Sequence, residues 1–305
     1  MEGGAPEITV IIPVRNGASV LARQLSALVE QDSQVPFEVV VADNGSDDET
    51  ARIAADYSDR LSLRVIDASA VTGASAARNE GARHARADRL AFLDADDVAG
   101  PGWLSALRRA QEKHPSAVLL GRLDFSAAND PAVLRAYRYI TDDPPAADVQ
   151  SEAPREVDPA ERTLPGGNFS LSRDTWLELG GMREDFPYGA EDLDLGLRAS
   201  DAGHSVVFVP DAVVHCSLRD TSAGIFRQQR QWSRARVLLA EQDPMHRLGS
   251  PSVRASASLL VRSVARAIPE SLGRRDLRPL ANDLGISLGR LEGAVAARRV
   301  RQTTP

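Results

Sequence analysis

Three aspartates lie close together in the sequence, directly after a short apolar run. The run covers residues 90–93, and Asp94, Asp96 and Asp97 follow it. Carboxylates at this spacing repel one another, so a bound cation would explain the group. Hard divalent cations such as Mg²⁺ take carboxylate oxygens and usually keep substrate phosphates as further ligands. The alternative is an acidic cap on the helix predicted at residues 101–112, because aspartate favours helix starts.

Polar residues also follow two other predicted strands. Buried strands are predicted at residues 7–14 and 37–42, and the polar segments Arg15-Asn16 and Asp43-Asn44 come after them. The alternation continues with helices at 20–31, 47–57 and 75–87 and a strand at 61–66. Alternating strands and helices with continuous apolar runs predict an α/β fold with a parallel sheet covered on both faces. Ligands of such sheets bind beyond the carboxyl ends of the strands, so we expect the polar segments to meet in one crevice.

The pattern is less regular in the second half of the chain. Residues 129–165 are rich in proline and acidic residues and show little apolar periodicity, which predicts a long loop that could act as a lid. Regular structure is predicted to return near residue 164. Helices are predicted at 174–179, 191–202 and 221–241, and strands at 205–209 and 212–215.

Composition excludes several classes of protein. No stretch approaches the roughly 20 apolar residues of a membrane span, and the first residues lack the features of a secretion signal. Cys216 is the only cysteine, so no internal disulfide is possible. We therefore expect a cytoplasmic protein, in which a free thiol is usual. The sequence contains neither a G-x-G-x-x-G after the first strand nor a P-loop, which argues against a dehydrogenase or a P-loop NTPase.

The net charge of −7 is unevenly distributed. Ten arginines and four acidic residues lie from residue 251 onward, which gives this segment a charge of +6 and leaves the first 250 residues at −13. An acidic body argues against nucleic acid as a partner. The basic segment needs a separate explanation.

Six segments of the chain together resemble the successive motifs of family 2 glycosyltransferases, in that family's order and at about its spacing. The similarity extends from residue 7 to about residue 240. It implies a GT-A fold, in which a Rossmann-like, mostly parallel sheet is flanked by helices. It also implies a nucleotide-sugar donor, a divalent metal (Mn²⁺ or Mg²⁺) and inversion at the anomeric carbon. The segments are Ile-Ile-Pro-Val-Arg-Asn, Ala-Asp-Asn-Gly-Ser-Asp-Asp-Glu-Thr, Ala-Ala-Arg-Asn-Glu-Gly, Leu-Asp-Ala-Asp-Asp, Gly-Gly-Asn-Phe-Ser-Leu and Gly-Ala-Glu-Asp-Leu-Asp-Leu.

The resemblance assigns donor-binding and metal-binding roles to particular positions. Asp97 would be the main metal ligand and Asp96 would hold the ribose and the metal, while Asp94 would either support these ligands from behind or contact the sugar. His215 would be a further metal ligand, although a lone histidine is also a common structural residue. The positions implied for the nucleoside pocket and the pyrophosphate are Pro13, Arg15, Asp43, Asn44 and Arg78, of which Arg78 could instead be a surface arginine on an alanine-rich helix.

A second acidic pair, Glu191-Asp192, resembles the family's catalytic base motif. Asp192 is the preferred base, with Glu191 as the alternative, although acidic residues at a helix start also act as caps. Gly166 and Gly167 would let the backbone approach the donor sugar closely, unless they form an ordinary turn.

Residues 228–232 are similar to the Gln-x-x-Arg-Trp segment of processive relatives, with Gln231 in place of the expected arginine. Arg230 or Trp232 would then cover the diphosphate. The departure at position 231 and the lack of membrane spans argue against a polymerase.

The predicted organisation is a catalytic domain at residues 1–250 and a basic helical extension at 251–305. The catalytic domain would divide into a nucleotide-sugar half at 1–122 and an acceptor half at 123–250. In the extension, apolar residues recur at helical spacing among arginines, as Leu259, Leu260, Val264 and Ile268 and as Leu284, Leu288, Leu291 and Val295. These helices would pack on the catalytic domain, form a homodimer, or lie peripherally on the inner membrane face.

The sequence thus predicts an inverting, metal-dependent glycosyltransferase. It would move one sugar from a nucleoside-diphosphate sugar, with a UDP-sugar favoured, to an acceptor hydroxyl of a glycan, a lipid or a small metabolite. The alternative is a non-catalytic module that binds sugar nucleotides or acts as a scaffold on the same fold.

Overall fold

A computed structural model describes residues 5–31, 34–137, 153–185, 189–243 and 248–303. The chain forms two compact units. The first comprises residues 1–127, 145–184 and 191–217, and the second comprises 128–144, 185–190 and 218–305. The predicted division at residues 122 and 250 is a division by function and stays a prediction.

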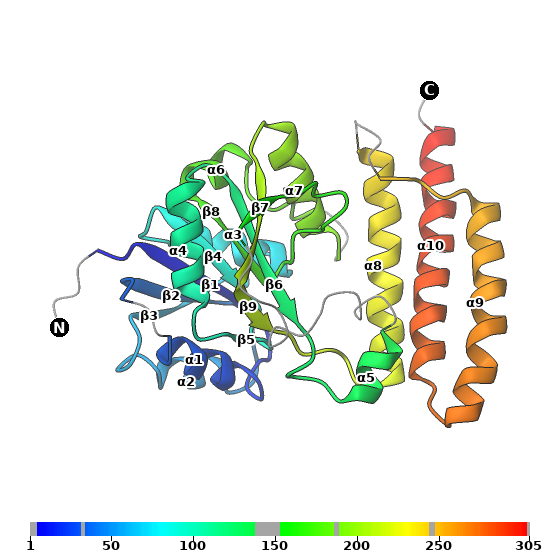
Figure 1. Cartoon of the computed structure of the whole chain (residues 1–305), viewed down its shortest axis with the longest axis horizontal. Coiled ribbons are helices and arrows are strands. Elements are labelled where there is room, and N and C mark those ends of the chain that lie inside the picture. Colours follow the sequence, from blue (N-terminus) through cyan, green and yellow to red (C-terminus); the bar gives the residue numbers. More distant parts are fainter. Residues whose placement is uncertain (1–4, 32–33, 138–152, 186–188, 244–247, 304–305) are drawn as a thin grey trace. The chain divides into compact units, whose positions relative to one another are not determined.

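The first unit is built on a nine-stranded sheet (Figure 1) with the strand order β3-β2-β1-β4-β8-β6-β9-β5, and β7 pairs with β9 outside this path. Strands β1, β2, β3 and β4 are mutually parallel, whereas β8 runs antiparallel to both β4 and β6. The mostly parallel α/β sheet predicted from the sequence is therefore confirmed. The strands are β1 (Ile8–Val14), β2 (Phe37–Asp43), β3 (Leu63–Asp67), β4 (Arg89–Leu93), β5 (Val98–Ala99), β6 (Val118–Asp124), β7 (Arg155–Glu156), β8 (Asn168–Ser172) and β9 (Val206–His215).

Alternate residues of the strands point to opposite faces, and both faces are buried. On β1, Val10 and Ile12 belong to one core cluster with residues of α1 and α4, while Ile11 belongs to another with residues of α3, α6 and α7. In the second cluster the rings of Phe92 and Phe169 stack at 4.3 Å between centroids. The helices of this unit are α1 (Leu21–Val29), α2 (Thr50–Ala55), α3 (Ala74–Arg83), α4 (Trp103–Lys113), α6 (Arg173–Glu178) and α7 (Glu191–Asp201).

The two strands predicted at 205–209 and 212–215 form the single strand β9. Its pairing with β6 changes register between Gly121 and Arg122, which is a β-bulge or a similar irregularity. Residues 138–152 of the lid predicted at 129–165 lie outside the described residues, but α5 (Pro131–Ala136) and β7 (Arg155–Glu156) fall within it.

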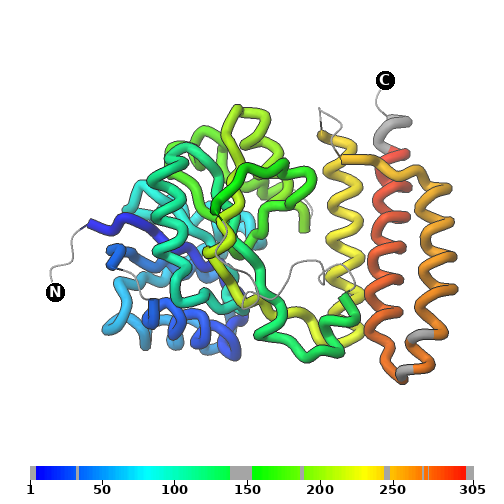
Figure 2. The backbone as a smooth tube through the Cα atoms, in the orientation of Figure 1, coloured from blue at the N-terminus to red at the C-terminus, as the bar shows by residue number. Residues whose placement is uncertain are grey.

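The second unit is helical and contains α5, α8 (Ser222–Gln242), α9 (Val253–Arg274) and α10 (Arg278–Thr303). Helix α10 packs against both α8 and α9 (Figure 2). Where α10 meets α8, a Cβ added at Gly285, Gly289 or Gly293 would stand less than 3 Å from atoms of α8, which include backbone carbonyls. These glycines therefore allow the two helix backbones to approach closely. Within the described part of the chain, no helix combines the length and apolar character needed to cross a membrane.

Candidate active site

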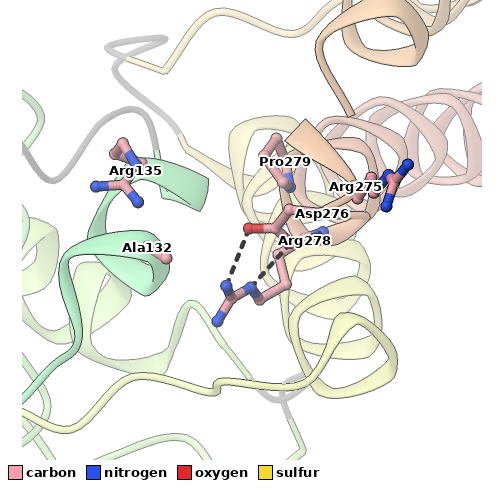
Figure 3. Close-up of a pocket in the computed structure, with 6 residues that line it drawn as sticks. All are labelled: Ala132, Arg135, Arg275, Asp276, Arg278 and Pro279. Atoms are coloured by element: carbon pink, nitrogen blue, oxygen red, sulfur yellow. Dashed lines mark hydrogen bonds and ion pairs between the residues drawn. The ribbon is translucent and has the colours of Figure 1, made fainter. Parts of the chain in front are cut away.

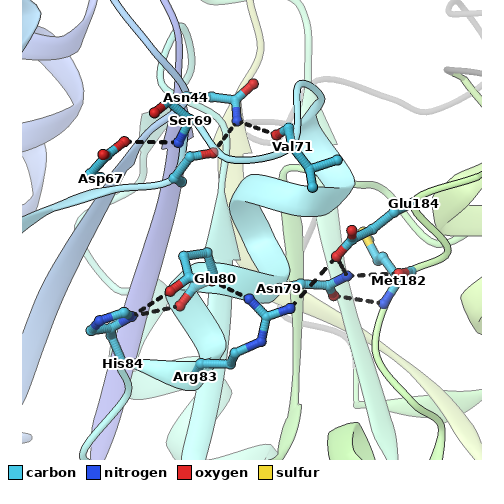
Figure 4. Close-up of polar contacts among 11 residues, drawn as sticks. Asn44, Asp67, Ser69, Val71, Asn79, Glu80, Arg83, His84, Met182 and Glu184 are labelled. Carbon is cyan, nitrogen blue, oxygen red and sulfur yellow. Dashed lines mark hydrogen bonds and ion pairs between the residues drawn. The ribbon is translucent and has the colours of Figure 1, made fainter.

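The ends of β1 and β2 bring together four residues predicted for the nucleoside pocket. Pro13 pairs with Ala42 across the two strands and Asp43 ends β2, and Arg15 is exposed directly after β1. Asn44 is buried, and its side-chain amide donates to the carbonyls of Ala68 and Val71 at 2.5 and 2.8 Å (Figure 4). The Gly73 N–H donates to Asn44 Oδ1 at 2.8 Å. Asn44 thus fixes the loop that leads into α3.

Helix α3 is also tied to the segment that precedes α7. The amide of Asn79 donates to the Met182 carbonyl at 2.8 Å and accepts from the Met182 N–H at 2.9 Å (Figure 4). It also donates to Glu184 at 2.7 Å. These bonds hold α3 in place, and with it Arg78, the residue before Asn79.

Arg78 is the centre of a group of carboxylates. Its side chain is 4% exposed; its Nη2 donates to Asp94 Oδ1 at 2.6 Å, and its Nη1 lies 3.9 Å from Glu191 Oε1. Burial alone would lower the pKa of the guanidinium, but the charges of Asp94, Glu191 and Asp192 raise it, and the net shift is upward. We call Arg78, Asp94, Glu191 and Asp192 the arginine cluster. The interpretation of Arg78 as a surface residue is wrong, because the side chain is buried.

Gly166 and Gly167 border this cluster. The Gly166 N–H donates to Asp192 Oδ2 at 3.1 Å. A Cβ at Gly166 would lie 3.3 Å from Arg78 Nη2, and one at Gly167 would lie 2.7 Å from Asp94 Oδ2. The backbone therefore lies close to the side chains of Arg78 and Asp94. A residue larger than glycine at position 167 would force Asp94 or the backbone to move.

Asp192 carries an unusual carboxyl group. Burial and the charge of Glu191 raise its pKa to about 7, although N–H donors from Leu193 and Gly166 and the charge of Arg78 act in the opposite direction. A carboxyl with this pKa exists in both protonation states near neutral pH. Such a group can accept a proton and hold it, which is what general base catalysis requires.

Asp94 also belongs to a second group, the aspartate cluster of Asp94, Asp96 and Asp97. One ligand atom from each of these residues lies within 4.8 Å of the others. Asp97 is 7% exposed, and burial followed by the charges of Asp94 and Asp96 raises its pKa well above the ordinary value. Its position is fixed by the Ser217 N–H, which donates to Oδ1 at 3.0 Å.

The aspartate cluster fits a hard divalent cation. It offers carboxylate oxygens, the ligand type that Mg²⁺ and Mn²⁺ prefer. Its three close carboxylates repel one another, and a cation between them would relieve that repulsion.

His215 lies on the strand next to Val98, but it does not belong to the aspartate cluster. It ends β9 and pairs with Val98, the residue after Asp97. Its Nδ1 lies 2.9 Å from Asp124 Oδ2. The predicted ligation of a metal by His215 stays a prediction.

Sequence reasoning missed Asp124, the last residue of β6. Its Oδ1 accepts from the Ser126 N–H and hydroxyl at 2.9 and 2.6 Å, and its Oδ2 is bonded to His215. Burial alone would raise its pKa, but the hydrogen bonds from Ser126 and His215 outweigh burial and lower it. Asp124 follows the apolar run at 117–120 only after Gly121, Arg122 and Leu123, so its signal was weaker than that of Asp94, which directly follows its run.

Arg230 and Trp232 lie in the second unit, on α8. The Arg230 guanidinium forms a two-pronged ion pair with Glu292 of α10, with Nη2–Oε1 at 2.7 Å and Nε–Oε2 at 2.9 Å. Trp232 packs against Gly189, where any Cβ would overlap the indole. Their predicted contact with a diphosphate stays a prediction.

The family model of glycosyl transferase family 2 matches residues 9–176, more than half of the sequence. The chain belongs to this family, and its fold is the GT-A fold.

A curated relative, the validoxylamine A glucosyltransferase of Streptomyces hygroscopicus subsp. jinggangensis, is 33% identical over 217 residues. The match covers 63% of this chain and 51% of that protein, so the chain spans about half of the relative's length.

Two solved structures share the fold at low sequence identity. Staphylococcus aureus TarS 1–349 in complex with UDP-GlcNAc superposes with a TM-score of 0.59 at 19% identity, covering 97% of this chain and 92% of that one. The mannosyltransferase PcManGT from Pyrobaculum calidifontis, in complex with GDP-Man and Mn²⁺, gives 0.59 at 18% identity, covering 99% and 76%.

Proposed function

We propose that this chain is a metal-dependent, inverting glycosyltransferase that transfers one sugar from a nucleoside-diphosphate sugar to an acceptor hydroxyl. The observation that carries the proposal is the arginine cluster. In this cluster, the carboxyl of Asp192, with a pKa of about 7, lies near the buried Arg78. The cluster also shares Asp94 with the aspartate cluster, which is suited to a cation. The family membership and the complexes of the two neighbours with UDP-GlcNAc and GDP-Man support a nucleotide-sugar donor.

The donor would lie across the ends of β1, β2 and β4. Pro13, Arg15 and Asp43 would line the nucleoside pocket, while Asn44 would act on it through the loop it holds. Asp94 would contact the transferred sugar next to Gly166 and Gly167. We favour a UDP-sugar, in line with the UDP-GlcNAc complex of TarS.

Asp96 and Asp97 would hold the metal, with His215 as a further ligand. A divalent cation bound there would stabilise the negative charge of the departing nucleoside diphosphate. Mn²⁺ in the PcManGT complex supports this assignment.

The transfer itself would be a single displacement. As the acceptor oxygen attacks the anomeric carbon, Asp192 takes the hydroxyl proton. The bond between that carbon and the diphosphate oxygen breaks on the opposite side, and the oxygen leaves with the electron pair. Configuration at the carbon is therefore inverted. Arg78 keeps Asp94 and Glu191 in place beside Asp192.

The acceptor would be a glycan, a lipid or a small metabolite, and the protein would act in the cytoplasm. The test is to incubate the full chain with a panel of nucleotide sugars and Mn²⁺ and to measure nucleoside diphosphate release with and without candidate acceptors. NMR of the product should show the anomeric configuration opposite to that of the donor. Tight nucleotide binding without release from any donor would instead support a binding or scaffolding module.

A further inference from the structure

Helix α9 has two contrasting faces. The fully buried positions of α9, which packs on α10, carry small residues: Ser256, Ser263, Ala267 and Ser271. Leu259, Leu260 and Val264 are half-buried. The predicted apolar position Ile268 differs from them, with 42% of its surface exposed. Burial within the second unit therefore does not account for every apolar residue of α9.

Apolar side chains form a stripe along the exposed face. Val261 and Leu272 are each 69% exposed, and together with Ile268 they follow a spacing of seven and four residues, which places them on one side of a helix. Leu277, in the turn to α10, is 57% exposed. We call Val261, Ile268, Leu272 and Leu277 the α9 stripe.

The charged side chains that the structure describes beside the stripe have one sign. Arg254, Arg262 and Arg266 are exposed, and every charged side chain that the structure describes on the exposed face of α9 is an arginine. Arg266 also pairs with Asp283 of α10 at 2.9 Å. An apolar stripe flanked by arginines is typical of a helix that lies in the interface of an anionic membrane.

A basic cavity adjoins the C-terminal end of α9, the end at which Leu277 lies. It has a volume of about 680 Å³ and lies between α5 and the α9–α10 turn (Figure 3), where Arg278 is bonded to Asp276 at 2.9 Å. Guanidinium groups bind phosphate oxygens well. The residues that line the cavity are Ala132, Arg135, Arg275, Asp276, Arg278 and Pro279.

We propose that the exposed face of α9 docks on the surface of an anionic phospholipid membrane. The α9 stripe enters the headgroup region, Arg254 and Arg262 contact lipid phosphates, and the basic cavity takes a headgroup beside Leu277. This goes beyond the proposed transfer reaction and does not depend on it. The whole chain has a charge of −7, so its net charge would be repelled by such a surface. Binding must therefore come from the local positive charge and apolar residues of α9.

A second copy of the chain fits this face less well. A two-fold symmetric contact applies the same surface to itself, so the arginines of one α9 would meet those of the other. Like charges in contact disfavour association. An anionic lipid surface complements both the charge and the stripe.

The test is flotation of the full chain with vesicles of phosphatidylglycerol and phosphatidylcholine in equal parts, or of phosphatidylcholine alone. We expect binding to the anionic vesicles that falls with added salt. Val261→Ser/Leu272→Ser should weaken binding by about tenfold or more, because two apolar side chains would no longer be buried in the headgroup region. Arg254→Gln/Arg262→Gln should weaken it about 25-fold, since each arginine near the surface contributes about 1 kcal/mol.

The matched control is Leu177→Ser on α6. Leu177 is 65% exposed, like the members of the stripe, but lies in the first unit, so its replacement should leave flotation unchanged. Equal flotation on both vesicle types, or α9 variants that bind like wild type, would overturn the proposal.

Two further measurements separate the alternatives. A dimer in analytical ultracentrifugation that Leu272→Ser dissociates, without vesicle binding, would assign the face to a second copy. Arg135→Gln/Arg275→Gln should weaken flotation, while inorganic phosphate alone should not raise the Tm. A phosphate-induced rise in Tm that this variant abolishes, without flotation of wild type, would make the cavity a site for free phosphate.

Discussion

The aspartate cluster and the arginine cluster share Asp94 but differ in how their negative charges are compensated. In the arginine cluster, a buried guanidinium from α3 lies 2.6 Å from Asp94 and 3.9 Å from Glu191. In the aspartate cluster, Asp97 is buried beside two further carboxylates, and its pKa rises well above the ordinary value. The first group carries its own cation, whereas the second is suited to a cation from solution. Removal of a metal should therefore leave the charge of the aspartate cluster uncompensated, while Arg78 still compensates Asp94 and Glu191.

The largest effect is expected from Asp97. Asp97→Ala, or exhaustive chelation of wild type, should reduce transfer by about 10⁴-fold, because a metal contributes several kcal/mol of charge stabilisation to the transition state. Mn²⁺ should also raise the Tm of wild type by mass action, but not that of Asp97→Asn. Full activity after chelation would contradict the difference between the two clusters.

The next effect concerns Asp192. Asp192→Asn should keep the fold, the Mn²⁺-dependent rise in Tm and nucleotide binding, and should lose transfer by about 10²–10⁴-fold, the usual contribution of a positioned base. Glu191→Gln is the matched variant and should retain more activity. If Glu191→Gln is inactive and Asp192→Asn is not, the base has been assigned to the wrong residue of the pair.

The pH profile tests the same carboxyl without a mutation. The pKa of Asp192 is raised to about 7, and a base is active only when deprotonated. Between pH 6 and pH 8, kcat/KM should therefore rise about tenfold and level off above the pKa. A flat profile over this range would exclude Asp192 as the group that titrates.

The smallest change comes from Arg78. Arg78→Gln removes the internal cation and should cost about 2 kcal/mol of unfolding free energy, because a charge-assisted hydrogen bond is lost at a partly exposed partner. Since the charge of Arg78 lowers the pKa of Asp192, the variant should also move the kinetic pKa above 7. Chemical denaturation and the pH profile measure the two effects, and a variant with unchanged stability would argue against a compensated cluster.

Much of the sheet and part of the site could be predicted from the sequence. The apolar runs at β1, β2 and β4 and the polar residues after them were sufficient, because a buried parallel strand is a continuous apolar segment. The contact of Arg78 with Asp94 and Glu191 could not be derived, since the last two residues lie almost a hundred positions apart and meet only through the order of the sheet. The resemblance named these residues but gave no distances.

The helical unit was harder to predict. The pattern at Leu284, Leu288 and Leu291 correctly indicated a helix, but it did not reveal the surface along which α10 packs. That surface contains Gly285, Gly289 and Gly293, where the backbone of α8 comes close. Apolar periodicity cannot detect such a contact, because glycine has no side chain to count.

The same three glycines set a limit on how this protein can evolve. At each of them, one additional methyl group would lie less than 3 Å from an atom of α8. At two of the three, that nearest atom is a backbone carbonyl oxygen, which no rotamer change can move. Substitution at these three positions of α10 is therefore excluded as long as the two helices keep their spacing, whereas side chains of α8 can still be exchanged. A lineage that replaced one of these glycines would have to separate the two helices first.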